Sequence, residues 1–334
     1  MIGELHKARA KSTNLGYDSK WKLFAGFASR AGFDPYGASP AQMADFLTYL
    51  FRERKLKPAT IKSYRAAIGH VLRLASGYDP GQDNIVALLM KSFQRQRPFF
   101  RNTTPSWDVS LVLAAWSTTH NNQMALDLLQ TKAIFLTALA SGARRSELWA
   151  LIGAAHEDES DPSLLVVQFS PDFVTKTQFS RGDKARFSSI SLPALPTHSE
   201  SVCPAAAVRT FLRRTESLRC SSNSALFFNL SEPARPTTKQ LISANVVRAV
   251  RWAYHSQRQA PPPHIRAHET RAISSSLRVA TGTGLDDILE AGKWTSPSMY
   301  FKHYQRGISL NARADLKRFP HIACAGKVID TSLL

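Results

Sequence analysis

The sequence predicts a mainly α-helical protein with two domains: a small helical bundle, and a larger helical domain that carries a small β-hairpin or sheet. The chain has 334 residues, of which 43% are hydrophobic and 20% charged, so it is long enough for two cores and too apolar to be disordered. Apolar residues recur at helical spacing in the front third. Short strand-like runs lie in the middle of the chain.

Residues 1–97 are expected to form the helical bundle. Ser39 before Pro40 marks a helix start, because serine caps the first turn and proline fits within it. A second helix is expected over about 58–76. The apolar positions of the bundle are Tyr17, Trp21, Phe24 and Phe27; Met43, Phe46, Leu47 and Leu50; Ile61, Tyr64, Ile68, Val71 and Leu72; and Ile85, Leu88 and Leu89.

The positive charge is concentrated in the front of the chain. The net charge is +18, and residues 1–105 hold 17 Lys and Arg against 7 Asp and Glu, a net of +10. Such an excess indicates a polyanionic partner, nucleic acid above all, although ribosome-like or heparin-type binding fits the number equally well. Either phosphate contact or a solvated face explains the basic residues of the bundle, and the candidate DNA contacts are Arg52, Arg54, Lys55, Lys57, Lys62, Arg65, Arg73, Arg95 and Arg97.

Residues 98–106 are expected to be a linker, because prolines and polar residues interrupt any helix there. A second domain is expected over 107–306 and a tail over 307–334, which would dock on a neighbouring protomer, dock on its own domain or be disordered. Helices are expected at about 111–116, 128–139, 204–218, 238–256, 268–280 and 285–293, and strands at 164–168, 186–192 and 225–228.

The three cysteines, Cys203, Cys220 and Cys324, are far apart in sequence, which favours buried thiols over a disulfide framework or a zinc site. A reducing compartment fits this pattern. No apolar run reaches the length of a membrane span, and the N-terminus lacks the apolar stretch of a signal peptide.

The segment from His268 to Tyr304 carries the chemistry. It places an imidazole, the guanidinium of Arg271 and a phenol near one another in sequence, which are groups that metal-free phosphodiester chemistry needs. A second arginine, Arg144, follows a glycine turn in SGARRSEL, with Glu147 on the same helical face; alone, this is typical of a surface ion pair. His268 and Arg271, three apart, are likewise expected to share a face of one helix.

The order of these motifs resembles the phage-integrase family of tyrosine recombinases. The chain carries SGARRSEL, TKT, HETR, GKW and FKHY in this order. The family has its arginine motif, hairpin lysine, H-x-x-R motif, His or Trp position and C-terminal tyrosine in the same order. The resemblance implies a helical core-binding (SAM-like) bundle followed by an α+β catalytic domain. The runs VCPAAAVRTFLRRT, RAHETRAISSS, ILEAGKWTS and YFKHY are similar to recombinases of DIRS-like retrotransposons and Crypton-type elements.

The resemblance also implies roles. Tyr304 would attack the scissile phosphate and form a 3′-phosphotyrosine. Arg144 and Arg271 would bind the non-bridging oxygens, where charge develops in the transition state. Lys176 would protonate the 5′-oxygen leaving group.

Three further residues are expected to support these. His268 would transfer a proton or hydrogen-bond the phosphate. Trp294, which stands where many relatives have a second histidine, would pack and donate its indole N–H. Glu147 would orient Arg144 or its neighbours.

Some assignments stay open. Trp294 and Tyr304 are ten residues apart, one more than is usual in the family, so Tyr300, six residues after Trp294, is a rival nucleophile. Phe301 and the residues after Tyr304 favour Tyr304. Arg145 is the neighbour that competes with Arg144, and Lys184 the rival of Lys176.

The family resemblance implies an enzyme that needs neither metal nor other cofactor. Its partners would be double-stranded DNA and copies of itself, as a tetramer on two DNA sites, without a membrane. It would work in the nucleus if the host is eukaryotic, and otherwise in the cytoplasm or nucleoid. The alternatives are a type IB topoisomerase-like nicking and religating enzyme, a catalytically inactive domesticated DNA-binding protein, and a basic RNA-binding or structural protein.

Overall fold

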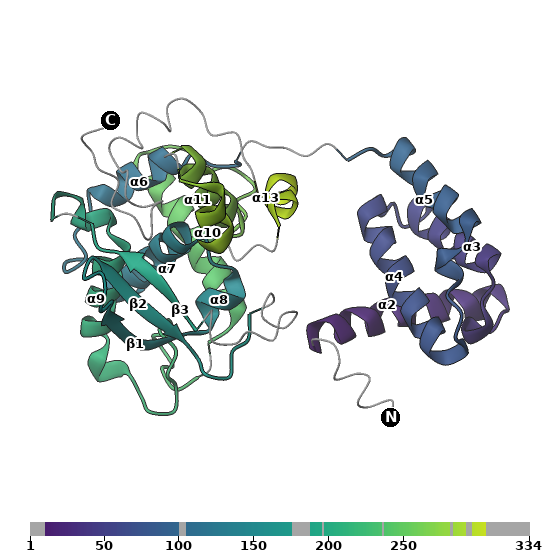
Figure 1. Ribbon diagram of the computed structural model, residues 1–334, viewed down its shortest axis with the longest axis horizontal. Coiled ribbons are helices and arrows are strands. Elements are labelled where there is room, and N and C mark those ends of the chain that lie inside the picture. The colour runs from purple at the N-terminus through teal and green to yellow at the C-terminus, as the bar shows by residue number, and fades with distance from the viewer. Residues whose placement is uncertain are drawn as a thin grey trace. The chain divides into compact units, whose positions relative to one another are not determined.

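The computed structural model describes residues 11–99, 105–175, 188–195, 197–235, 237–280, 283–291 and 296–304. The chain divides into two compact units, a front unit, Met1–Arg101, and a rear unit, Asn102–Leu334 (Figure 1). The division lies within the segment 98–106 that the sequence marks as a linker. The tail 307–334 lies outside the described residues.

The front unit is a bundle of helices. Its α-helices are α2 (Lys11–Ala31), α3 (Pro40–Arg52), α4 (Pro58–Ser76) and α5 (Asn84–Gln96), with the short 3-10 helices Pro35–Gly37 and Pro80–Gln82. Ser39 starts α3 as expected: its Oγ accepts from the backbone N–H of Gln42 at 3.2 Å, and the Gln42 Oε1 accepts from the N–H of Ser39 at 2.8 Å. The core of the unit is built mainly from Phe24, Met43, Phe46, Leu47, Leu50, Ile61, Ile68, Leu72, Val86, Met90 and Phe93.

The apolar face predicted for α5 is only partly correct. Leu89 packs against the core as predicted, but Ile85 and Leu88 are 58% and 54% exposed, whereas Val86, Met90 and Phe93 are buried. The buried residues follow i, i+4, i+7 spacing, so the face that packs starts one residue later than the sequence pattern indicated.

The rear unit packs helices against one small sheet (Figure 1). Strands β1 (Leu151–Glu157), β2 (Leu164–Phe169) and β3 (Ser189–Pro193) are antiparallel neighbours in the order β1-β2-β3, with Val166 opposite both His156 and Ser191. The described helices are α6 (Val109–Ser117), α7 (Leu126–Ser141), α8 (Arg145–Trp149), α9 (Pro204–Arg214), α10 (Lys239–Ser256), α11 (Glu269–Ala280), α12 (Leu285–Ala291) and α13 (Pro297–His303).

Helix α7 is the central element of this unit. Every residue from Leu129 to Ala140 is buried, and the helix packs against α9, α10 and α11. Its sequence is apolar on nearly all faces, which is the pattern of a helix surrounded by other elements. The C-terminus of α7 therefore has a fixed place in the core, and the chain leaves it directly toward Arg144.

The third strand is not where the sequence placed it. Residues 225–228 form only an isolated bridge, Ala225 to Ile152, and Phe227 and Phe228 are buried in the core. The third strand is instead β1, which the sequence did not mark because LIGAAHE lacks a run of strand-forming residues. The helix expected over 204–218 ends at Arg214, and a short 3-10 helix follows.

A lysine side chain lies inside this core. Lys132, on α7, is fully buried and donates to the carbonyl of Thr119 at 3.2 Å and to its Oγ1 at 2.9 Å. Burial lowers its pKa to about 7, and the charge of Glu200 opposes this. Of the helices that the structure describes, none is both long enough and apolar enough to span a membrane.

Candidate active site

Arg144 follows the turn at the end of α7. Gly142 ends the helix in the left-handed conformation (φ +60°), and its N–H donates to the carbonyl of Ala138 at 3.1 Å. A β-carbon at Gly142 would also lie 3.2 Å from the Oγ of Ser274 on α11. Glycine is therefore favoured here by both backbone angle and packing.

Arg144 is held by a buried carboxylate. Glu147 is 1% exposed; its Oε1 accepts from the Arg144 guanidinium at 2.7 Å, and its Oε2 accepts from the Arg144 backbone N–H at 2.7 Å. The Arg144 side chain keeps 22% of its surface exposed. One carboxylate thus fixes both ends of this arginine while the side chain still reaches the surface.

Arg271 lies on α11, near enough to Arg144 for their charges to interact. Its side chain is 4% exposed, donates to the carbonyl of Gly142 at 2.5 Å, and lies over the Tyr304 ring at 5.1 Å from the ring centroid. Burial and, next, the charge of nearby Arg144 lower the pKa of Arg271 to about 10, although Glu147 and Tyr304 oppose both effects. Arg271 is therefore protonated at neutral pH and belongs to one electrostatic cluster with these three residues.

The two tyrosines of the last helix have different surroundings. Tyr300 is fully buried on α13, and burial raises its pKa. Tyr304 follows the last residue of α13, is half-buried, and donates its backbone N–H to the carbonyl of Tyr300 at 2.8 Å. Tyr304 is thus the tyrosine with both exposed surface and a guanidinium beside its ring, and we keep it as the predicted nucleophile.

His268 lies one residue before α11, although the helix was expected to begin at 268. Helix α11 begins at Glu269, so His268 precedes it and is exposed, whereas Arg271 is buried two residues into the helix. The buried Glu269 accepts a hydrogen bond from Ser106 Oγ, which ties the start of α11 to the last residue of the predicted linker.

Three predicted residues, Lys176, its rival Lys184, and Trp294, lie outside the described residues. The segment that carries both lysines connects the paired strands β2 and β3. Two buried α11 residues that the sequence reasoning missed, Ser274 and Arg278, face the α7 end. They lie three and seven residues after Arg271, and this spacing is the sequence signal that places them on the same face of α11 as Arg271.

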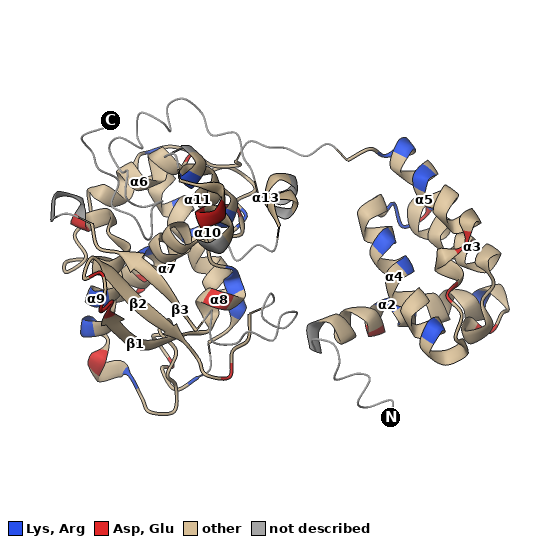
Figure 2. Ribbon diagram, viewed as in Figure 1, with Lys and Arg blue, Asp and Glu red and all other residues tan. Residues whose placement is uncertain are grey.

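The predicted DNA contacts of the front unit fall into two groups. Figure 2 shows lysines and arginines along α4, before it, and at the end of α5. Arg73 pairs with Asp79 at 2.5 Å, while Arg97 lies over the Phe51 ring at 3.9 Å and donates to the carbonyl of Leu56 at 3.3 Å. These two arginines stabilise the bundle itself. Arg73 is nevertheless exposed, with 58% of its side chain accessible. The other exposed members of the set are Arg52, Arg54, Lys55, Lys57, Lys62 and Arg95, and Arg65 is half-buried.

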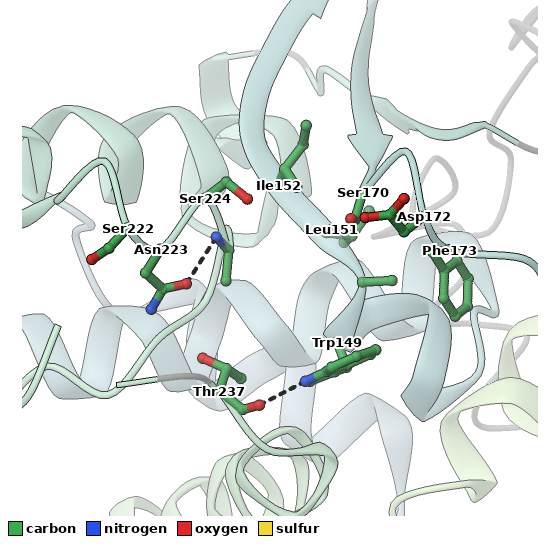
Figure 3. A pocket seen from close by; sticks show the side chains of 12 residues that line it. Trp149, Leu151, Ile152, Ser170, Asp172, Phe173, Ser222, Asn223, Ser224 and Thr237 are labelled. Atoms are coloured by element: carbon green, nitrogen blue, oxygen red, sulfur yellow. Dashed lines mark hydrogen bonds between the residues drawn. The ribbon is translucent and has the colours of Figure 1, made fainter. Parts of the chain in front are cut away.

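A pocket of about 310 Å³ opens beside α8 (Figure 3). Trp149 and Phe173 line it, together with Asp172 and the loop 222–225, and the Trp149 indole donates to the carbonyl of Thr237 at 2.7 Å. None of the described candidate catalytic residues lines this pocket. The candidate active site is instead a surface cluster around Arg144.

No protein-family model and no curated protein matches the sequence. Solved structures do match in fold. An integrase of transposon Tn1549 in complex with a circular intermediate DNA gives a TM-score of 0.59 at 14% identity, over 93% of this chain and 94% of that one. A lambda integrase dimer bound to a COC′ core site gives 0.51 at 17% identity, over 90% and 75%. The XerH site-specific recombinase bound to a palindromic difH substrate gives 0.50 at 16%, over 85% and 70%.

The fold is that of the tyrosine recombinases. Within the tyrosine-recombinase fold of this chain, the end of α7, the buried face of α11 and the end of α13 converge. They bring Arg144, Arg271 and Tyr304 together from positions 160 residues apart in sequence, as the contact of Arg271 with Gly142 and with the Tyr304 ring shows.

Proposed function

We propose that the chain is a site-specific DNA recombinase that cuts and rejoins DNA through a 3′-phosphotyrosine intermediate. The observation that carries this proposal is the cluster of two arginines and one partly exposed tyrosine, in which the Arg271 guanidinium lies 5.1 Å from the Tyr304 ring centroid. Phosphoryl transfer needs positive groups beside the nucleophile, because negative charge builds on the non-bridging oxygens in the transition state.

In the proposed reaction, the Tyr304 hydroxyl oxygen attacks the scissile phosphorus and gives its proton to His268. The phosphorus–O5′ bond breaks, and the 5′-oxygen leaves with a proton from Lys176. Arg144 and Arg271 hold the non-bridging oxygens, and His268 and Trp294 are proposed to assist at the same phosphate. Rejoining reverses these steps with a 5′-hydroxyl from another strand. Because the phosphotyrosine conserves the phosphodiester energy, the chemistry needs no ATP.

Both units would contact the DNA duplex, with the exposed basic residues of the front unit on the phosphates. Exchange of strands between two sites requires four copies, and a lambda integrase tetramer bound to a Holliday junction is among the similar structures, at a TM-score of 0.52. The similarity of HETRAISSS and its flanking runs to DIRS-like and Crypton-type recombinases favours a mobile-element enzyme that acts in a nucleus.

The test is covalent capture. The full chain is incubated with a pool of nicked duplexes of randomised sequence, and captured DNA is enriched over rounds. We expect a protein–DNA band that survives denaturing electrophoresis and is lost in Tyr304→Phe but kept in Tyr300→Phe. Tight DNA binding without any band would contradict the proposal and favour a non-catalytic DNA-binding protein.

DNA that carries the captured sites then distinguishes a recombinase from a type IB topoisomerase-like enzyme. A recombinase joins two duplexes that carry the site. A type IB topoisomerase-like enzyme relaxes supercoiled plasmid alone and forms no joined product. Joined product from two labelled duplexes is the result expected here.

A further inference from the structure

We propose that Arg278 is a positioning residue that fixes the C-terminus of α7 and, through it, Arg144. This inference rests on the proposed function for its consequence in catalysis, but its structural part stands on contacts alone. Arg278 is 4% exposed and donates to the carbonyl of Ala140, in the last turn of α7, at 2.9 Å.

A helix end leaves its last carbonyls without partners inside the helix. At the end of α7, the carbonyl of Ala138 accepts from the Gly142 N–H, that of Ala140 from Arg278, and that of Gly142 from Arg271. Helix α7 has no basic residue in its own last turn. The positive charge that favours a helix C-terminus comes instead from α11.

The α11 residues that do this lie on one face. Arg271, Ser274 and Arg278 are spaced i, i+3, i+7, and all three are buried. Ser274 fills the place where a side chain at Gly142 would lie, with its Oγ 3.2 Å from such a β-carbon. This face of α11 therefore contacts both the last turn of α7 and the turn that follows it.

Packing alone does not account for an arginine at this position. Burying a guanidinium is costly, and an apolar side chain of the same length would fill the space without that cost. What the apolar side chain lacks is the donor to Ala140. Because Gly142 stands only two residues before Arg144, a shift of the α7 end moves the guanidinium that the proposed reaction needs.

A shift of the Arg144 guanidinium is expected to slow the proposed reaction strongly. A displacement of about 1 Å in a catalytic group can cost roughly 100-fold in rate. Arg278 has no need to touch DNA for this effect. Its loss should therefore slow cleavage while leaving DNA affinity unchanged.

The experiment compares Arg278→Met, Arg278→Lys and a matched control, Arg219→Met. Arg219 is partly buried and, like Arg278, donates to backbone carbonyls, those of Ala225 at 3.1 Å and Leu226 at 3.0 Å. Each variant is measured for the rate of covalent complex formation at saturating captured DNA, for DNA affinity, and for hydrogen exchange of the amides of residues 142–144.

For Arg278→Met, we expect cleavage slower by about 10- to 100-fold, DNA affinity within about twofold, and faster exchange at these amides. Arg278→Lys should recover part of the rate, and Arg219→Met should change neither the exchange nor the rate. Unchanged exchange in Arg278→Met, or a rate loss matched by Arg219→Met, would overturn the inference. If the wild-type chain forms no covalent complex, the proposed function fails, and the exchange data alone decide the structural claim.

Discussion

Arg144 and Arg271 lie close enough for their charges to interact, but their side chains are held in different ways. Arg144 is partly exposed and held by the Glu147 carboxylate, whereas Arg271 is buried and held by a backbone carbonyl and an aromatic ring. The two guanidiniums repel each other, which helps lower the pKa of Arg271 to about 10. One carboxylate offsets two positive charges only in part, so an arriving phosphate relieves the repulsion that remains.

Replacing Glu147 by Gln tests this balance at the scale of one residue. The amide keeps the size of the side chain but removes the charge that pairs with Arg144. We expect the free energy of unfolding of the rear unit to fall by about 1–3 kcal/mol, because one partner of a largely buried pair is lost. Inorganic sulfate should raise the melting temperature of Glu147→Gln more than that of the wild type, since it supplies the missing negative charge. An equal response in thermal melts would contradict the account.

Lys132 gives a prediction that is independent of catalysis. Its pKa is about 7 in the folded chain and ~10.4 in an unfolded one. Between these values the unfolded chain binds more protons, so the stability of the wild type rises with pH, by up to about 1.4 kcal/mol per pH unit. Below about pH 7 the cost of burying the charge is present in full.

The measurement is the difference in free energy of unfolding between wild type and Lys132→Met, followed by urea titration from about pH 7 to about pH 9. The difference should move in favour of the wild type as the pH rises. Since Met cannot titrate, a flat difference would show that the pKa of Lys132 is not depressed.

At the scale of elements, the site depends on how α7 ends. Gly142 and Gly77 are both left-handed C-caps, of α7 and α4, with φ of +60° and +74°. A β-carbon at Gly77 would have nothing within 4 Å, whereas at Gly142 it would press on Ser274. The pair thus separates the effect of backbone conformation from that of packing against α11.

We expect Gly77→Ala and Gly142→Ala each to lower the free energy of unfolding of their unit by about 1 kcal/mol, because alanine is disfavoured at positive φ. Only Gly142→Ala should also slow covalent complex formation, since it pushes α11 away from the turn before Arg144. Denaturant titrations and cleavage rates of both variants check this. Equal cleavage rates in the two variants would contradict the role assigned to the turn.

The elements also show what the sequence can and cannot predict. Helix α3 was predictable to its first residue, because Ser39 and Pro40 are local signals read by the first turn alone. Strand β1 was not, because it is held by pairing with β2, which lies later in the chain, rather than by its own residues. The register of α5 failed for the same reason, since the partner helix decides which of two adjacent apolar faces is buried.

The candidate site follows the same rule. The motif order identified Arg144, Arg271 and Tyr304, whose proximity the structure provides through tertiary packing. Spacing places Arg278 on the helical face of Arg271, but neither the exposed position of His268 before α11 nor the burial of that face could be deduced from spacing. Both depend on where α11 begins and on what covers it.

At the scale of the whole molecule, the net charge of +18 should make the proposed DNA binding depend on salt. The logarithm of the binding constant should fall linearly with the logarithm of salt concentration. Each phosphate contact that is removed should reduce the magnitude of this slope by about 0.9. The structure separates the basic residues that are available for such contacts from those engaged within the bundle.

Lys57→Ala and Arg73→Ala are the matched pair for this prediction. Lys57 is exposed just before α4, whereas Arg73 is paired with Asp79. We expect Lys57→Ala to reduce the salt slope and Arg73→Ala to leave it nearly unchanged, measured by fluorescence anisotropy on one captured duplex. The reverse result would show that the exposed cluster before α4 is a solvated face.

The central claim is that Tyr304, beside Arg144 and Arg271, becomes joined to DNA. Digestion of the covalent complex with protease and nuclease, followed by mass spectrometry of the nucleotide-bearing peptide, tests it most directly. The account predicts a peptide that carries the 3′-nucleotide on Tyr304. A nucleotide on Tyr300 or on any other residue, or a wild-type protein that yields no such peptide from DNA it binds tightly, would contradict it.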